Sequence, residues 1–155
     1  SYVNVGTYAM HEYDSGLPGD SFKYTYAILI PRFLWPEKPV LTSVATDLNF
    51  SATGSFNSSV SAGISVELYW NFGWVGLFVG ALGIGILLYL WSLYTIRVQE
   101  VGAWHLFAVV LLGMKVGTRS DGFIVTDIFG PLLLAVLGHF ALSAIDKVIA
   151  VRKRD

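Results

Sequence analysis

The sequence predicts an all-α, polytopic transmembrane protein with a large extracytoplasmic loop. Three observations support this fold class: an apolar composition, one long uninterrupted apolar stretch, and positive charge that follows two of the apolar stretches. Hydrophobic residues make up 54% of the 155 residues, above the roughly 45–50% that is usual in soluble domains. The 10 basic and 11 acidic residues nearly cancel, so no overall field favours nucleic acid as a partner.

Residues 1–71 are predicted to form the extracytoplasmic loop, because this segment is polar and rich in turn-forming residues. Within it, Ser21–Pro31 is apolar enough to form a partly embedded helix. The chain then passes three prolines within nine residues, which forbids a continuous helix because proline lacks the N–H and clashes with the preceding turn. We expect a stiff turn that holds Arg32, Trp35 and Lys38 against the membrane surface.

The first transmembrane helix is predicted over residues 72–96, about 25 residues without an Asp, Glu, Lys or Arg. That length crosses a hydrocarbon core of about 30 Å. The pairs Gly76/Gly80 and Ala81/Gly85 have the spacing that lets another helix approach closely. Aromatic residues near both ends have the placement expected for interfacial belts: Tyr69, Trp70, Trp74, Trp91 and Tyr94.

Two further apolar stretches follow. Residues 101–117 are short for a span and form either a transmembrane or a re-entrant helix. Residues 123–145 are long enough but carry Asp127 and His139 inside. These two residues lie twelve positions apart, more than three helical turns, so they cannot touch. We expect each to bond to a neighbouring helix, with a packing role for His139.

Positive charge sets the predicted orientation. Arg97 follows the first apolar stretch, and Arg152, Lys153 and Arg154 lie in a basic tail, residues 146–155. Because basic residues favour the cytoplasmic side, the C-terminus is predicted to be cytoplasmic. Residues 1–71 and the connection at 115–122 then lie on the outer face.

Several kinds of chemistry have no support. The chain has no cysteine, which excludes disulfides and thiolate ligands. It has no DxD sequence, and its histidines, His11, His105 and His139, are scattered, so we expect neither a metal nor a cofactor. The sequence starts at Ser1 with nothing that resembles a signal peptide. We therefore expect an upstream-truncated fragment.

Two local sequences carry a family resemblance. The first is a Pro-Arg-x-x-Trp-Pro-x-Lys-Pro stretch formed by Pro31, Arg32, Trp35, Pro36, Lys38 and Pro39. The second is a glutamate shortly before Asn-Phe-Gly at the start of a membrane helix, formed by Glu67, Asn71, Phe72 and Gly73. With these, the chain resembles the C-terminal part of bacterial oligosaccharide repeat-unit polymerases, the O-antigen polymerase (Wzy-like) superfamily.

The resemblance implies a glycosyltransferase of the bacterial inner membrane. Such an enzyme polymerises undecaprenyl-pyrophosphate-linked oligosaccharide repeat units on the outer face, without a metal ion. Its implied partners are these lipid-linked glycans and the bilayer, together with a flippase and a chain-length regulator. A ligase that transfers a finished glycan remains a neighbouring possibility.

A pyrophosphate leaving group needs fixed positive charge, which arginine supplies through two parallel hydrogen bonds. The basic residues predicted on the outer side are Arg32, Lys38, Lys115 and Arg119. We assign catalytic roles to Arg32 and Arg119, and substrate-binding roles to Lys38, Lys115 and Trp35. The alternative is that Arg32 pairs with Glu37, and Arg119 with Asp121, as solvated loop charges.

Glycosyl transfer also benefits from a carboxylate that takes the proton of the acceptor hydroxyl. Glu67 is the preferred candidate, because it precedes the first span on the outer side. Asp121 is assigned to substrate binding, and Asp127 lies within reach of the same interface. Asp121 has an alternative role as a favourable charge at the start of a helix.

Two other functions fit parts of the sequence. A transporter or flippase would use Asp127 and His139 along a pathway. A structural subunit would use the glycine-rich helix for contacts only. A transporter or flippase does not explain why an outer loop places Arg32, Trp35 and Lys38 among prolines.

Overall fold

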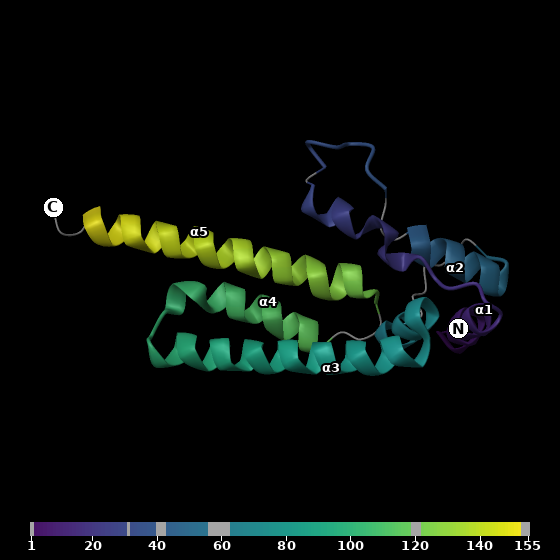
Figure 1. The fold of residues 1–155 in the computed structure, drawn as a ribbon. Helices are drawn as coiled ribbons and strands as arrows, with labels where there is room; N and C mark the ends of the chain where they lie inside the picture. The colour runs from purple at the N-terminus through teal and green to yellow at the C-terminus, as the bar shows by residue number, and fades with distance from the viewer. Residues whose placement is uncertain (1, 31, 40–42, 56–62, 119–121, 153–155) are drawn as a thin grey trace.

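The computed structural model describes residues 2–30, 32–39, 43–55, 63–118 and 122–152 (Figure 1). These ranges contain helices and connecting turns and no strand, which confirms the predicted all-α class. In chain order the elements are α1 (Tyr2–Asp14), the 3₁₀ helix η1 (Ser21–Leu29), α2 (Ser43–Thr53), α3 (Ile64–Glu100), η2 (Trp104–Leu106), α4 (Phe107–Thr118), the π-helical turn η3 (Val125–Phe129) and α5 (Gly130–Arg152).

The segment predicted as a loop with one partly embedded helix has a 3₁₀ helix, η1, at that place. It also contains two helices, α1 and α2, that the sequence did not indicate. They form a small core with the start of α3, because apolar side chains recur at helical spacing on their facing sides. The buried members of this core are Val5, Ala9, Val44, Ala45, Leu48, Trp70 and Phe123. Helices α1 and α2 are therefore folded against the start of α3 and not extended as an open segment. We name the group formed by α1, α2, η1, the start of α3 and η3 the polar assembly.

Helix α3 bends sharply at Gly73, which has φ 63° and ψ −154°. Residues with a side chain rarely adopt a positive φ. In addition, Tyr13 of α1 occupies the space that a side chain at position 73 would need. The bend divides α3 into a short limb, residues 64–72, and a long limb, residues 74–100; Figure 1 shows the ribbon turning at this point. The predicted span at residues 72–96 thus corresponds to the long limb.

The glycine pairs of the long limb are used differently from the prediction. Leu68 of the short limb packs against Gly80, and the Leu68 carbonyl oxygen lies against Gly76. The pair Gly76/Gly80 therefore packs against the short limb of its own helix and not against another helix. Gly85 has open space around it within the described chain, so the second pair has no partner helix there.

The long limb, α4 and α5 form one layer, which we name the helical layer. Figure 1 shows α4 between α3 and α5, with α3 and α5 running in one direction and α4 in the other. Trp91 of α3 packs closely against Gly113 of α4. Its indole Nε1 donates to the Val110 carbonyl oxygen at 3.3 Å. Helix α4 therefore approaches α3 this closely because position 113 has no side chain.

The second predicted span is shorter than a bilayer. After a turn at Val101–Gly102 and the 3₁₀ helix η2, α4 has 12 residues. At about 1.5 Å per residue this helix is about 18 Å long, well short of a hydrocarbon core of about 30 Å. The helix alone is too short to cross, and both alternatives, a transmembrane and a re-entrant helix, stay predictions.

The third predicted span begins with the π-helical turn η3 and continues as α5 beyond residue 145. Pro131 stands at the second position of α5, directly after the π turn. Because proline donates no backbone hydrogen bond, an irregular turn at this point is physically reasonable.

Within the described part of the chain, two helices are long and apolar enough to cross a membrane: α3, and the stretch Val125–Ile149 that joins η3 to α5. Large apolar side chains on both are exposed, including Leu82 at 66% and Phe140 at 68%.

Candidate functional site

The candidate site lies along η1, where the polar assembly meets the helical layer. The start of this helix contributes to three features: Ser21 to a buried polar network, Phe22 to an apolar groove, and Lys23 to a polar cleft. Its end carries the turn at residues 32–39. One short helix therefore brings together features that lie far apart in the sequence.

The buried network centres on Glu67, whose side chain is fully buried. The Ser21 hydroxyl donates to Glu67 Oε1 at 2.6 Å, and the Ile124 backbone N–H donates to Oε2 at 2.7 Å. Asn71 Nδ2 donates to the Ser21 hydroxyl and to the Glu67 carbonyl oxygen, both at 2.9 Å. Glu67 therefore ties η1 and the segment before η3 to the short limb of α3. A substrate hydroxyl would have to displace Ser21 or Ile124 to reach this carboxylate.

Asp127 lies in η3, close to this network. Its Oδ2 atom is buried and has no hydrogen-bond partner among the described residues. Its Oδ1 atom is 3.4 Å from the Thr126 hydroxyl, and Gly122 leaves the space that its carboxylate occupies. The predicted bond from Asp127 to a neighbouring helix is not formed within the described ranges.

A polar cleft of about 220 Å³ opens between α1, η1, α2 and the short limb of α3. It is lined by Glu12, Asp20, Lys23, Ser43, Val44, Asp47, Leu48, Ser51 and Trp70. Three carboxylates and one ammonium group make this lining acidic. Carboxylates accept hydrogen bonds from hydroxyl groups and repel phosphate, so the cleft suits a hydroxyl-rich ligand.

Two carboxylates of the cleft already have side-chain partners: Asp20 pairs with Lys23, and Glu12 is bonded from Trp70 and Tyr8. The Trp70 indole Nε1 donates to Glu12 Oε2 at 3.0 Å, and the Tyr8 hydroxyl also bonds to Glu12. This bond to Glu12, and then burial, raises the pKa of Tyr8 above its ordinary value, so its hydroxyl stays protonated at neutral pH. By contrast, the carboxylate of Asp47 is exposed and forms no hydrogen bond or ion pair with the described residues.

The sequence did not indicate this cleft. Trp70 was predicted to lie in an interfacial belt, but it is only 7% exposed and lies among α1 and α2. The position predicted for Trp70 is wrong because the bend at Gly73 turns the short limb towards α1. Trp74, one turn beyond Trp70, is 59% exposed, and its place in the belt stays a prediction.

An apolar groove of about 260 Å³ lies on the other side of the short limb. It is lined by Phe22, Leu68, Gly80, Gly83, Ile84, Leu87, Ile124, Ile128 and Phe129. The ring of Phe22 lies 5.6 Å from that of Phe72. The groove suits a hydrocarbon chain and offers no charged group to a ligand.

The turn at residues 32–39 is fixed to η1 by two of the predicted site residues. Lys38 Nζ donates to the carbonyl oxygens of Ala27 and Ile30 at 2.9 and 2.8 Å. The ring of Trp35 stacks on that of Tyr26, with centroids 6.2 Å apart and planes at 19°. Lys38 therefore caps the end of η1, which is a different use of its charge from the predicted phosphate contact.

Arg32 is exposed, and its Nη1 donates to the Pro36 carbonyl oxygen at 3.4 Å. Within the described ranges it forms no ion pair with Glu37, the alternative considered above. Ser21 and Leu29, the two ends of η1, lie about 16 Å apart along the axis at about 2 Å per residue, and Arg32 follows the far end. Arg32 is therefore separated from Glu67, which bonds to Ser21.

The remaining predicted residues lie near the start of the third apolar stretch. Lys115 is exposed in the last turn of α4. Arg119 and Asp121 lie outside the described residues. The roles assigned to these three residues stay predictions.

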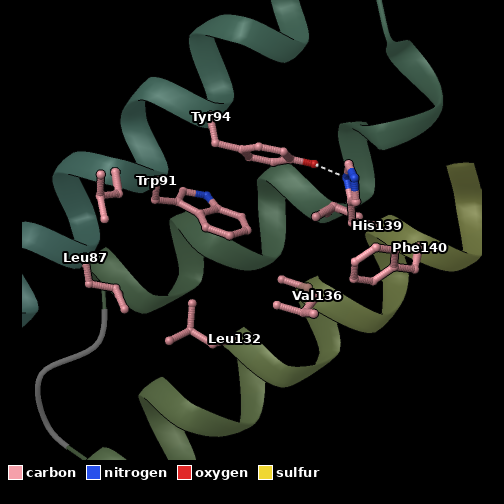
Figure 2. A pocket seen from close by; sticks show the side chains of 10 residues that line it. Leu87, Trp91, Tyr94, Leu132, Val136, His139 and Phe140 are labelled. Atoms are coloured by element: carbon pink, nitrogen blue, oxygen red, sulfur yellow. Dashed lines mark hydrogen bonds between the residues drawn. The ribbon is translucent and has the colours of Figure 1, made fainter.

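A third cavity, of about 450 Å³, lies between α3, α4 and α5 within the helical layer. Figure 2 shows its apolar and aromatic walls, with Tyr94 and His139 pointing toward one another. The Tyr94 hydroxyl lies 2.9 Å from His139 Nδ1. The prediction that His139 bonds to a neighbouring helix is thereby confirmed.

Comparison of the chain with protein-family models, with curated proteins and with solved structures gave no match. Among the described residues, no group of three His, Asp or Glu side chains is arranged to hold a metal ion.

Proposed function

We propose that this chain belongs to a membrane glycosyltransferase of the bacterial inner membrane that polymerises undecaprenyl-pyrophosphate-linked repeat units on the outer face. The proposal begins with the resemblance of the Pro-Arg-x-x-Trp-Pro-x-Lys-Pro turn to that of O-antigen polymerases. It takes the long limb of α3 and the stretch Val125–Ile149 as spans. The polar assembly then lies outside, and Arg97 and the basic tail lie in the cytoplasm.

The observation that carries the proposal is the polar cleft, because it lies at the same end of the molecule as the resembling turn. A repeat unit offers many hydroxyl groups, and the cleft offers acceptors for them in Glu12, Asp20 and Asp47. The acidic lining excludes a pyrophosphate, which is instead assigned to Arg32, outside the cleft. The two sites are separated along η1, a separation that an extended glycan can bridge.

The reaction then has one proton transfer and one displacement. The acceptor hydroxyl loses its proton to a carboxylate and attacks the anomeric carbon of the donor sugar, whose bond to the pyrophosphate oxygen breaks. Undecaprenyl pyrophosphate leaves with the bonding electrons, and arginine stabilises its charge. Glu67 is enclosed, and Asp47 lies in the cleft, apart from Arg32. We therefore assign Asp47 to binding of the glycan hydroxyls and assign the base to no described residue.

The proposal is tested in cells that make a lipid-linked repeat unit, with the chain lengths of the glycan as the readout. Arg32→Ala and Asp47→Asn should each reduce long chains at least about tenfold, as expected when a charge-assisted bond is lost. Lipid-linked single repeats should accumulate outside. The matched control is Arg97→Ala, because Arg97 is also exposed and pairs only loosely with Glu100, at 3.7 Å.

Unchanged chain lengths in both variants, at normal protein level, would refute the assignment. Single repeats retained inside the cell would point instead to a transporter or flippase. Asp127 favours that second function, because its buried Oδ2 has no partner among the described residues. Normal chains that fail to reach their final acceptor would indicate a ligase.

A further inference from the structure

We propose that the tip of the turn at residues 32–39 inserts into the outer lipid leaflet as a wedge, an inference that rests on the membrane placement proposed above. Phe33 and Leu34 form this tip and are 81% and 67% exposed. Phe33 is the most exposed large apolar side chain in the described part of the chain. Adjacent apolar side chains held in water are unfavourable unless another surface covers them.

The turn is built to hold these side chains outward. Lys38 bonds to two carbonyl oxygens at the end of η1, and Trp35 stacks on Tyr26. Pro36 fixes the backbone between them. The tip is therefore already held in one conformation, so its insertion would restrict few additional rotatable bonds.

Charge and ring chemistry favour a phospholipid surface as the occupant. The exposed guanidinium of Arg32 makes one long bond, at 3.4 Å, to Pro36. A guanidinium has five N–H donors, and most of those of Arg32 have no partner among the described residues. Beside an apolar tip, these donors complement lipid phosphates. Trp35 and Tyr26 supply the amphipathic rings that are favoured at this interface.

The position of the turn supports the same occupant. Helix η1 contacts η3, at the start of α5. Figure 1 shows the turn projecting on the α5 side of the molecule, whereas α1 and α2 lie beyond the end of the helical layer. The turn thus lies on the side of the layer formed by α5, a helix with exposed apolar side chains that include Leu134 at 58%.

The absence of cysteine allows a direct test with single labels. Phe33→Cys is compared with Phe78→Cys on the long limb and Thr53→Cys on α2, all at exposed positions. Each variant of the full chain carries an environment-sensitive fluorophore in vesicles of phosphatidylcholine with phosphatidylglycerol. Nitroxide lipids should quench the label at 33 and at 78 severalfold more than the label at 53, and aqueous iodide should do the reverse. Replacing phosphatidylglycerol should weaken lipid quenching at 33 and leave position 78 unchanged.

The outcomes separate the wedge from the membrane placement. Lipid quenching at 78 with iodide quenching at 33 would overturn the wedge and leave the placement intact. Iodide quenching at 78 would overturn both. Protection of position 33 from both quenchers would also overturn the wedge, because a protein surface would then cover the tip. A Leu34→Cys label should move toward water when Phe33→Asp is added.

Discussion

The polar assembly and the helical layer differ in the contacts that their side chains form. In the polar assembly, hydrogen bonds join side chains that are distant in sequence: Ser21 with Glu67 and Asn71, Trp70 with Glu12, and Tyr69 with Asp14. In the helical layer, such contacts are few, and they include Trp91 with Val110 and Tyr94 with His139. The layer instead exposes apolar side chains on both long helices.

This difference indicates two different surroundings. A hydrogen-bonded assembly is stable against water because its own groups replace the lost solvent contacts. An exposed apolar layer gains nothing from water, but loses nothing in a bilayer, where the surrounding chains are equally apolar. Polar bonds should therefore dominate stability in the assembly, and close packing should dominate it in the layer.

The largest expected effect is the loss of the Glu67 carboxylate. Glu67→Ala leaves the Ser21 hydroxyl and the Ile124 N–H without their acceptor in a buried place. Each unsatisfied group costs about 1–3 kcal/mol, so the free energy of unfolding should fall by about 3 kcal/mol or more. Denaturant unfolding in detergent, followed by tryptophan fluorescence, measures this change.

Two other variants calibrate the Glu67 result. Glu67→Gln keeps the shape but turns an amide N–H₂ toward one of the two donors, so its effect should be intermediate. Glu100→Ala removes a carboxylate that is exposed and loosely paired with Arg97, and should change stability by less than about 0.5 kcal/mol. Equal effects for Glu67→Ala and Glu100→Ala would contradict the role of the network.

The second effect concerns packing in the layer. In Gly113→Ala the new methyl group would meet the ring of Trp91, and forcing these helices apart should cost about 1–3 kcal/mol. Gly85→Ala is the matched control, because nothing lies within 4 Å of the added carbon. The same unfolding assay should show no loss for Gly85→Ala. A comparable loss in both variants would mean that helix geometry, and not contact with Trp91, sets the cost.

The sequence was most informative where the signal is local. The long limb and α5 follow from continuous apolar stretches, since hydrophobicity is a property of the residues themselves. The pairs Val5/Ala9 and Val44/Leu48 have helical spacing, but α1 and α2 are too short and too polar for this spacing to decide their structure. The bend at Gly73 was not predicted, because neighbouring glycines have the same local sequence character and only packing by Tyr13 distinguishes this one.

The candidate site was less predictable because its contacts are non-local. Glu67 precedes the long apolar stretch, but its burial depends on Ser21, 46 positions earlier. Lys38 was predicted to bind phosphate, because the sequence does not show that its ammonium group lies beside the last carbonyl oxygens of η1. Residue types that suit glycan chemistry could thus be recognised, while which of them face a ligand required the fold.

The smallest expected effect is the loss of one hydrogen bond within the helical layer. Tyr94→Phe removes one hydrogen bond, to His139, beside a cavity that is otherwise apolar. Hydrogen bonds between membrane helices contribute about 0.6 kcal/mol on average, because each group finds other partners when the helices separate. A double-mutant cycle of Tyr94→Phe with His139→Leu should therefore give a coupling energy near that value, below the cost of Gly113→Ala. A coupling above about 2 kcal/mol would show that the layer depends on polar bonds as strongly as the assembly does, and the division between the two regions would not hold.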